Sequence, residues 1–339
     1  MLADRRPGLD PRRLLDLMRT AIAACRLDLT GRVVLTEAAT GAYAVTPALA
    51  ALAGAERVIA LTQSSRHGPA ARGEAETMEL AAAAGVAGRV EVVAERRPEL
   101  VAAADVITNS GHVRPIDAEM ASWMRPTAVV PLMFEAWELL PDRGDLDLPA
   151  LRRRGVRVAG TNERHPAVAV FSYLDVMACK LLLDAGVAVR GSKLLLLCDN
   201  PFGPYLHHGL AAAGAGVEAC TLPVEATSDR FDAVVVALRP RSGPVLGPDE
   251  VTHVAERWPG AVVAQFWGDL DRAMLATAGV PFWPLDPPGQ GRMGVLPSAV
   301  GPEPIVRLQA GGLKVAEVLL RPERQRTGTD EEFVDAIVG

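Results

Sequence analysis

Short runs of aliphatic residues alternate with longer stretches of mixed polarity along the whole chain. The runs GRVVLTEA (31–38) and KLLLLCD (193–199) are typical of buried strands, whereas PRRLLDLMRTAIAACRLD (11–28) repeats apolar residues at helical spacing. Such alternation favours parallel sheets, because parallel neighbours need a crossover between them. The further expected strands are 56–62, 89–94, 105–110, 127–134, 217–223, 231–238 and 260–267. The further expected helices are 40–54, 73–85, 98–104, 117–124, 204–214, 248–258 and 307–320, and residues 145–160 add one more helix and strand.

This order predicts an α/β protein with two Rossmann-like, doubly wound parallel-sheet domains joined by a long interdomain helix at 166–185. We expect an N-terminal domain over 1–165, with a closing helix at 306–320 packing on it, and a C-terminal domain over 166–305. Residues 281–305 are dense in Pro and Gly, which favours an ordered loop. The polar residues 321–339 are expected to form a loose tail or a dimer contact.

Composition narrows the class of protein. The 339 residues, 49% of them hydrophobic, are enough for two domains with real cores. A net charge of −6 argues against nucleic acid or an anionic membrane as a partner, and no run reaches the roughly 18 apolar residues of a membrane span. Four cysteines without CxxC spacing and an N-terminus unlike a signal peptide favour a cytoplasmic protein with reduced thiols. No ligand spacing resembles a metal site.

Polar residues follow several of the expected strands. In open α/β sheets ligands bind beyond the carboxyl ends of the strands, so we expect these residues to face one cleft between the domains and to bind a small-molecule substrate there. The candidate catalytic residues are His112, Arg114, Glu135, Glu163, Arg164, His165 and Asp199.

The segment TNSGHVRP (108–115) is the first catalytic candidate. His112 can move protons near neutral pH, and Arg114 can clamp a carboxylate or a phosphate. The alternative is that His112 caps the next helix and Arg114 lies on the surface.

Two acidic segments are further candidates. Glu163 and His165 are expected to form an acid–base pair with Arg164 as anion binder, or else a polar loop fixed by a local salt bridge. Glu135 and its neighbour Glu138 are candidate general bases, or mark a hinge.

A nucleotide site is expected in the first half. A glycine turn opens the helix at 40–54, and the second strand ends in hydroxyls and an arginine, which suit the 2′-phosphate of NADP better than the ribose of NAD. The alternative is a glycine that permits close helix–strand packing. The candidate cofactor-binding residues are Thr40, Gly41, Ala42, Tyr43, Ser64, Ser65, Arg66 and Asn109.

Residues 145–320 resemble the D-2-hydroxyacid dehydrogenase superfamily, which includes formate and glycerate dehydrogenases. The resemblance is carried by DLDL before GVRV (145–158), by the strand, turn and helix of 193–214, and by FDAVVVALRP, AVVAQFWGDLDRAML and MGVLPSAVGPEP. It implies a homodimer, a nicotinamide cofactor and the two-domain fold given above.

The chain also departs from that family. The family's G-x-G-x-x-G turn reads CDNPFG (198–203) here, where Asp199 either caps a helix or binds a ligand group, and the family's catalytic Arg and His fall on Trp267 and Ser298. The candidate substrate-binding residues are Asn162, Asn200, Gln265, Trp267 and Ser298.

Three functions are therefore open. The first is an NAD(P)-dependent oxidoreductase of a small polar, carboxylated metabolite. The second is a non-redox lyase, isomerase or transferase on a dehydrogenase-derived scaffold that has lost dinucleotide binding. The third is a binding protein without catalytic activity on the same scaffold.

Overall fold

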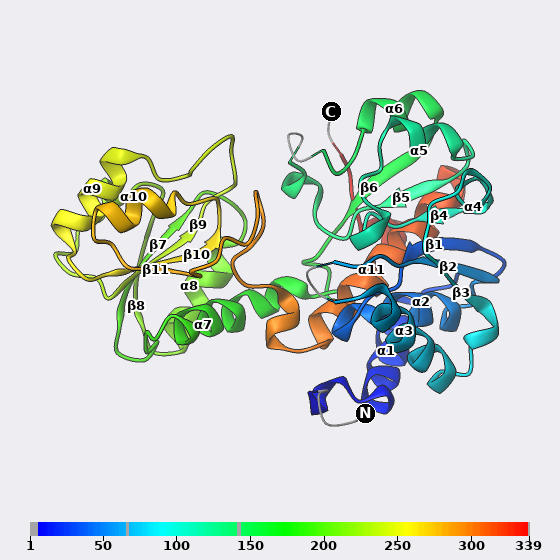
Figure 1. Cartoon of the computed structure of the whole chain (residues 1–339), viewed down its shortest axis with the longest axis horizontal. Helices are drawn as coiled ribbons and strands as arrows, with labels where there is room; N and C mark the ends of the chain where they lie inside the picture. The colour runs from blue at the N-terminus through cyan, green and yellow to red at the C-terminus, as the bar shows by residue number, and fades with distance from the viewer. Residues whose placement is uncertain (1–5, 66–67, 141–143, 338–339) are drawn as a thin grey trace. The chain divides into compact units, whose positions relative to one another are not determined.

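The computed structural model describes residues 6–65, 68–140 and 144–337, and it divides into two compact units (Figure 1). The first unit contains Met1–Val170 and Gly301–Gly339, and the second contains Phe171–Val300. Each unit is an α/β domain built on a parallel sheet.

The first unit is built on a sheet in which the described strands follow the order β12-β6-β5-β4-β1-β2-β3. All neighbours are parallel except β12, which pairs antiparallel with β6 and places Val334 opposite Thr161. The strands are β1 Val33–Glu37, β2 Arg57–Leu61, β3 Val90–Val93, β4 Val106–Ile107, β5 Val129–Pro131, β6 Arg157–Thr161 and β12 Val334–Asp335.

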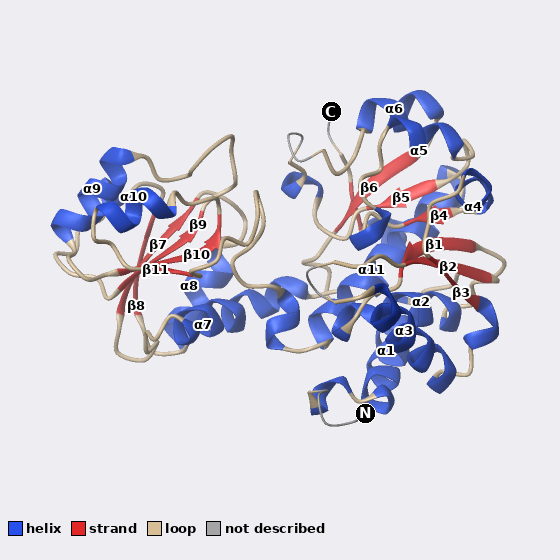
Figure 2. Ribbon diagram, viewed as in Figure 1, coloured by secondary structure: helices blue, strands red, loops and turns tan. Residues whose placement is uncertain are grey.

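Alternate residues of these strands enter two cores, one on each face of the sheet, and Figure 2 shows the helices that accompany its strands. Val34 and Val58 face one core, and their neighbours Leu35 and Ile59 face the other, as the period of two requires. The first core is covered by α1 Pro11–Cys25, α2 Val45–Leu52, α3 Ala70–Ala83 and α11 Glu303–Leu320. The second is covered by α4 Pro98–Ala103, α5 Ala118–Trp123 and α6 Leu148–Arg154.

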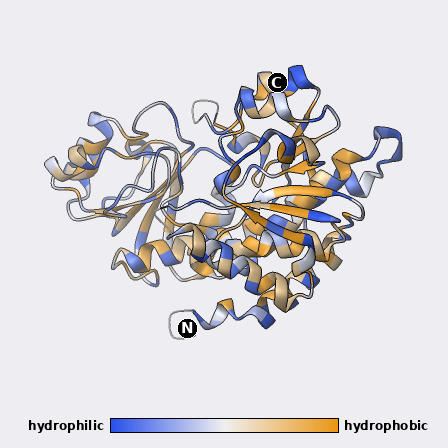
Figure 3. Cartoon of the chain, turned by 45° about the vertical axis from the view of Figure 1, so that its right-hand side comes forward, coloured by the Kyte–Doolittle hydropathy of each residue, from blue (hydrophilic) through white to orange (hydrophobic). Residues whose placement is uncertain are grey.

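The second unit is built on a parallel sheet whose described strands follow the order β11-β10-β9-β7-β8. The strands are β7 Lys193–Cys198, β8 Gly216–Cys220, β9 Ala233–Ala237, β10 Val262–Trp267 and β11 Phe282–Trp283. Leu195, Val234 and Val263 form a core with α9 Pro248–Arg257 and α10 Arg272–Thr277. The other face is covered by α7 Leu174–Asp184 and α8 Gly203–Ala212. In Figure 3 hydrophobic residues dominate the strands, as expected for sheets covered on both faces.

Several expected elements differ in extent. The helix expected at 166–185 is shorter, because a 3₁₀ turn at Val170–Tyr173 precedes α7. The helix expected at 40–54 likewise begins with a 3₁₀ turn, Gly41–Ala44, and Gly41 enters it with a φ of +64°. The loop expected at 281–305 contains β11 and the first turn of α11.

The expectation of a loose tail after residue 320 is wrong for its described part. Residues Gly328–Glu331 form α12, and β12 extends the sheet of the first unit. Phe333 is buried, and Asp330 forms ion pairs with Lys314 and Arg321 of α11. Tertiary contacts, and not the local pattern, order this segment.

Among the described residues, no helix combines the length and the apolar character needed to cross a membrane.

Candidate functional site

Each sheet has a point at which the strand order reverses. In the first unit β1 lies between β2 and β4, and in the second β7 lies between β8 and β9. Crossovers leave such a point in opposite directions, which opens a crevice at the carboxyl ends of the strands where ligands bind.

Glu37 is the last residue of β1 and lies at the switch point of the first unit. Its side chain is only 6% exposed. Burial raises the pKa of Glu37 to about 7, although the charge of Arg114 and hydrogen bonds from the His112 N–H and the Ser110 hydroxyl lower it. A carboxyl with such a pKa exists in both protonation states at neutral pH.

A chain of hydroxyl groups leads to this carboxyl. The hydroxyl of Thr108, just after β4, donates to Thr36 at 2.9 Å and lies 2.8 Å from the Ser110 hydroxyl, which bonds Glu37. The hydroxyls of Thr36, Thr108 and Ser110 are all buried, so this row of hydrogen-bonded groups connects the middle of the sheet to the crevice.

The turn after β4 covers Glu37 closely. Gly111 has a φ of +40°, and a Cβ on it would lie 1.3 Å from the Oε2 atom of Glu37. A glycine is required here for both reasons.

The expected residues His112 and Arg114 lie in this turn and the residue after it. The backbone N–H of His112 contacts Glu37, and Nη1 of Arg114 is 3.4 Å from Oδ2 of Asp145. His112 does not cap α5, because the side chain of Asp117 accepts from the Met120 N–H there.

A second polar group lies at the ends of β5 and β6. Glu135 is fully buried and accepts from Nε of Arg164 at 3.0 Å, from Nε1 of Trp137 at 2.6 Å and from the Glu163 N–H at 3.2 Å. Oε1 of Glu138 accepts from the Glu135 N–H at 3.0 Å. Arg164 thus forms an ion pair with Glu135, which is distant in sequence and not part of the local salt bridge that the sequence analysis considered.

The carboxyl of Glu163 is 7% exposed, and no hydrogen bond to it is present among the described residues. Burial raises the pKa of Glu163 well above its ordinary value, and the carboxylates of Glu138 and Glu135 raise it further.

His165 does not pair with Glu163. Its ring stacks on Phe333 with centroids 3.8 Å apart, its Nδ1 accepts from the Ala167 N–H, and its Nε2 is 3.8 Å from Oε2 of Glu332. Burial lowers the pKa of His165, although Glu332 raises it. Asn162 also binds this segment, through its amide nitrogen and the Glu332 carbonyl at 2.8 Å. These contacts join His165 and Asn162 to the C-terminal segment.

The turn expected to hold a dinucleotide in the first unit is already bonded. The Gly41 N–H donates to Oε2 of Glu76 at 2.6 Å, so a carboxylate holds the donor that a phosphate would need. Ala42 is buried, and Thr40 and Tyr43 are half-buried.

The remaining expected cofactor residues serve local contacts. The hydroxyl of Ser64 accepts from the Ala70 N–H, and Ser65 forms a bridge with Gly68. Oδ1 of Asn109 accepts from the Met133 N–H at 2.9 Å and so links the ends of β4 and β5. Arg66 lies outside the described residues.

In the second unit, Asp199 and Asn200 lie at the switch point. Oδ1 of Asp199 accepts from the Arg239 N–H at 2.8 Å and from Nδ2 of Asn200 at 3.1 Å. Nδ2 of Asn200 also donates to the Ala237 carbonyl at 2.6 Å, which ties β7 to β9. Asp199 does not cap α8, since it is Asn200 whose side chain accepts from the Phe202 N–H.

The expected substrate residues of β10 are buried. Gln265 is fully buried and accepts from Arg272 at 2.6 Å, and Trp267 is 3% exposed and donates to the Gly291 carbonyl at 3.2 Å. As placed, these side chains support the loop that contains Gly291, and they offer a ligand almost no surface. Ser298 lies in the 3₁₀ turn Pro297–Val300 and is half-buried.

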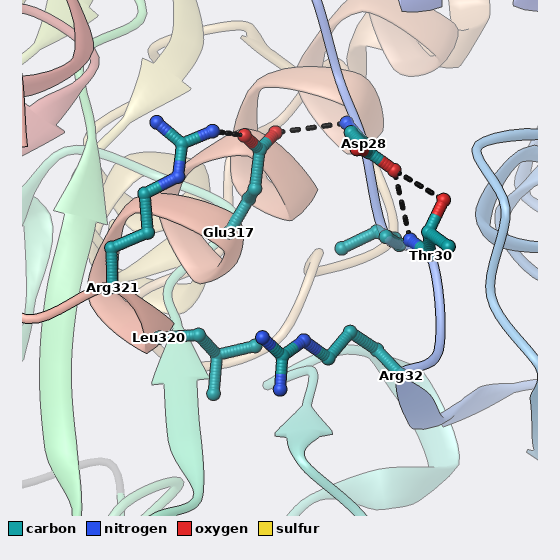
Figure 4. Close-up of a pocket in the computed structure, with 7 residues that line it drawn as sticks. Asp28, Thr30, Arg32, Glu317, Leu320 and Arg321 are labelled. Atoms are coloured by element: carbon teal, nitrogen blue, oxygen red, sulfur yellow. Dashed lines mark hydrogen bonds and ion pairs between the residues drawn. The ribbon is translucent and has the colours of Figure 1, made fainter. Parts of the chain in front are cut away.

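A pocket of about 140 Å³ lies at the other end of the first sheet, before β1 (Figure 4). It is formed by the loop after α1 and the last turn of α11. Its acidic groups are already bonded, because Glu317 pairs with Arg321 and accepts from the Asp28 N–H, and Asp28 accepts from Thr30. We read this pocket as part of the ion-pair network that holds the C-terminal segment.

The sequence analysis missed Glu37 as a site residue. The signal was present, since a carboxylate ends the otherwise apolar run VVLTE (33–37), where a buried charge is costly unless it is used or bonded.

Comparisons with known proteins bear on the fold. No protein-family model matches the chain, and no curated protein matches it in sequence. A dipicolinate synthase chain from Bacillus halodurans has a similar structure, with a TM-score of 0.54 and 13% identity over 87% of this chain and 100% of that chain. The corresponding dipicolinate synthase chain from Bacillus subtilis has a TM-score of 0.52 and 11% identity, over 84% of this chain and 95% of that chain. NAD⁺-bound 3-phosphoglycerate dehydrogenase of Entamoeba histolytica has a TM-score of 0.45 and 8% identity, over 85% of this chain and 95% of that chain.

The similarity to the two dipicolinate synthase chains confirms the predicted fold of two parallel-sheet α/β domains.

Proposed function

We propose that this protein is an enzyme that acts on a small carboxylated metabolite at the carboxyl edge of the first sheet, with Glu37 as its acid–base group. The observation that supports this proposal is the buried carboxyl at a switch point whose pKa is raised to about 7.

Glu37 has the properties of a general acid–base catalyst. A group with a pKa near the working pH donates and accepts protons with comparable ease. The Ser110 hydroxyl and the His112 N–H hold the carboxyl in one orientation, which pre-organises it for proton transfer.

Arg114 is the group we propose to bind the substrate's carboxylate. It is half-buried, its charge acts on Glu37, and its present partner Asp145 is 3.4 Å away. A guanidinium binds a carboxylate through two parallel hydrogen bonds, which would fix the metabolite beside Glu37.

Two forms of this proposal differ in whether a hydride moves together with the proton. An NAD(P)-dependent oxidoreductase needs a binding site for a dinucleotide, whereas a lyase or isomerase needs only the proton transfer. The bond from Gly41 to Glu76 removes a phosphate donor from the first unit, and this observation favours the non-redox form.

Proton exchange in D₂O tests the role of Glu37 without knowledge of the full reaction. The protein is incubated with a panel of 2-oxo and 2-hydroxy acids, and loss of their C–H signals is followed by proton NMR. We expect exchange with some of these acids, rising with pH through about 7 as Glu37 becomes a base. Glu37→Gln should slow it at least about 100-fold.

Glu56→Gln is the matched control, since Glu56 is exposed just before β2. Exchange that persists unchanged in Glu37→Gln would exclude Glu37 as the acid–base group. An absence of exchange with every acid of the panel would contradict the proposed substrate class.

A further inference from the structure

The second unit contains the turn at which a dinucleotide-binding domain holds pyrophosphate, between β7 and α8. In such turns glycines let the backbone approach the phosphates, and free N–H groups at the helix N-terminus bind them. We propose that this turn is closed by its own side chains, so that the second unit binds no nicotinamide dinucleotide.

Two N–H groups of the turn are already used. The Phe202 N–H donates to Oδ1 of Asn200 at 3.1 Å, and the Gly203 N–H donates to the Asn200 carbonyl at 3.1 Å. Pro201 and Pro204 have no N–H to offer. A pyrophosphate would have to break these bonds before it gained its own.

The turn also carries an amide and a carboxylate side chain. Asn200 stands where the second glycine of the G-x-G-x-x-G pattern would be, and its amide reaches across the switch point to the Ala237 carbonyl. Asp199 is held beside it by the Arg239 N–H. The carboxylate of Asp199 would repel a phosphate bound at this turn.

Phe202 keeps the turn in this conformation. Its side chain is 2% exposed and lies among aromatic rings, with centroids 5.2 Å from Phe171 and 5.4 Å from Trp267. Opening the turn would therefore move a residue of the core.

This inference deepens the proposed function, because it makes the reaction at Glu37 one that uses no dinucleotide in the second unit. It can fail independently, since its test observes the Gly203 N–H and not the chemistry at Glu37.

The test uses a sequence coincidence. Phe202-Gly203 is the single Phe-Gly pair in the chain, so labelling Phe carbonyl carbons and Gly nitrogens gives one NMR peak for the Gly203 N–H. We expect no shift of this peak when NADH or NADPH is added to the whole protein, up to about 1 mM. In the variant Asp199→Ser/Asn200→Gly the peak should shift, with binding at least about tenfold tighter.

Asp229→Ser is the control, since Asp229 is an exposed carboxylate of the same unit and should leave the peak unmoved. If the double variant does not fold, judged by near-ultraviolet circular dichroism, Asp199→Ser alone removes the charge and keeps the bonds of Asn200 to Ala237 and Phe202. A saturable shift in the wild-type protein would overturn the inference. A folded variant that gains no binding would show that these side chains do not close the turn.

Discussion

A single carboxyl, Glu37, should govern part of the pH dependence of folding. Its pKa rises from 4.5 to about 7 in the folded protein, so between these values the folded chain keeps a proton that the unfolded chain has released. The stability that Glu37 supplies is complete below about pH 4.5 and is lost as the pH rises through 7. The glutamine side chain of the Glu37→Gln variant cannot ionise. Its unfolding free energy should therefore fall less between pH 5 and pH 8 than that of the wild-type protein, by about 3 kcal/mol.

Urea unfolding at the two pH values measures this difference. Glu163 also has a raised pKa, but it is present in both proteins and cancels in the comparison. Equal pH dependence in the two proteins would mean that Glu37 is ionised throughout, and the acid–base role would fall with it.

Gly111→Ala should destabilise the same site. The new methyl group would meet Oε2 of Glu37 and would sit on a residue with a φ of +40°, so we expect a loss of more than about 2 kcal/mol. Gly85→Ala is the matched control, because Gly85 has a φ of +73° and no atom within 4 Å of its Cβ position. Its cost should be only the conformational one, about 1 kcal/mol. Equal losses of unfolding free energy in Gly111→Ala and Gly85→Ala would show that the Glu37 side chain moves away from the new methyl group without cost.

Among the elements, β12 shows how tertiary contacts hold a strand of two residues. Phe333→Ala should cost about 3 kcal/mol, because this buried ring stacks on His165 and fills the core beside α11. It should also raise the pKa of His165, since burial is the main cause that lowers it. Chemical denaturation and NMR titration of His165 measure the two effects.

Glu332→Gln separates charge from packing. It leaves the ring of Phe333 in place and removes the carboxylate 3.8 Å from His165, so the pKa of His165 should fall instead of rising. A rise of this pKa in Glu332→Gln would show that Glu332 does not face His165 in solution.

The sequence predicted long, apolar elements well and short or polar ones poorly. Runs such as KLLLLCD carry their own signal, because a strand covered on both faces must be apolar throughout. Strand β12 carries none, since the order of its segment depends on Ala136, Asn162 and Lys314, which are distant from it in sequence. His112 and Arg114 could be placed near a switch point, because they directly follow a predicted strand. The Glu135–Arg164 pair and the stacking of His165 on Phe333 could not be foreseen, because their partners are distant in sequence.

At the scale of the whole molecule, the chain path makes the second unit an insertion between β6 and α11 of the first. Phe171–Val300 is continuous, and it carries a complete described sheet and its own core. A domain with these properties has what it needs to fold alone. We therefore expect a fragment of residues 171–300 to unfold cooperatively, with dispersed NMR signals and the Phe202–Gly203 peak at its position in the whole protein.

The complementary deletion gives the sharper comparison. Joining Val170 to Gly301 through a short glycine linker keeps every described strand of the first sheet, including β12, and should preserve the raised pKa of Glu37, because all groups that set it belong to the first unit. The pKa is measured by NMR titration of a labelled Glu37 carboxyl, with Glu37→Gln to assign it. A normal pKa in this protein would show that burial of Glu37 needs the second unit, and the two units would then have to be treated as one folding and functional body.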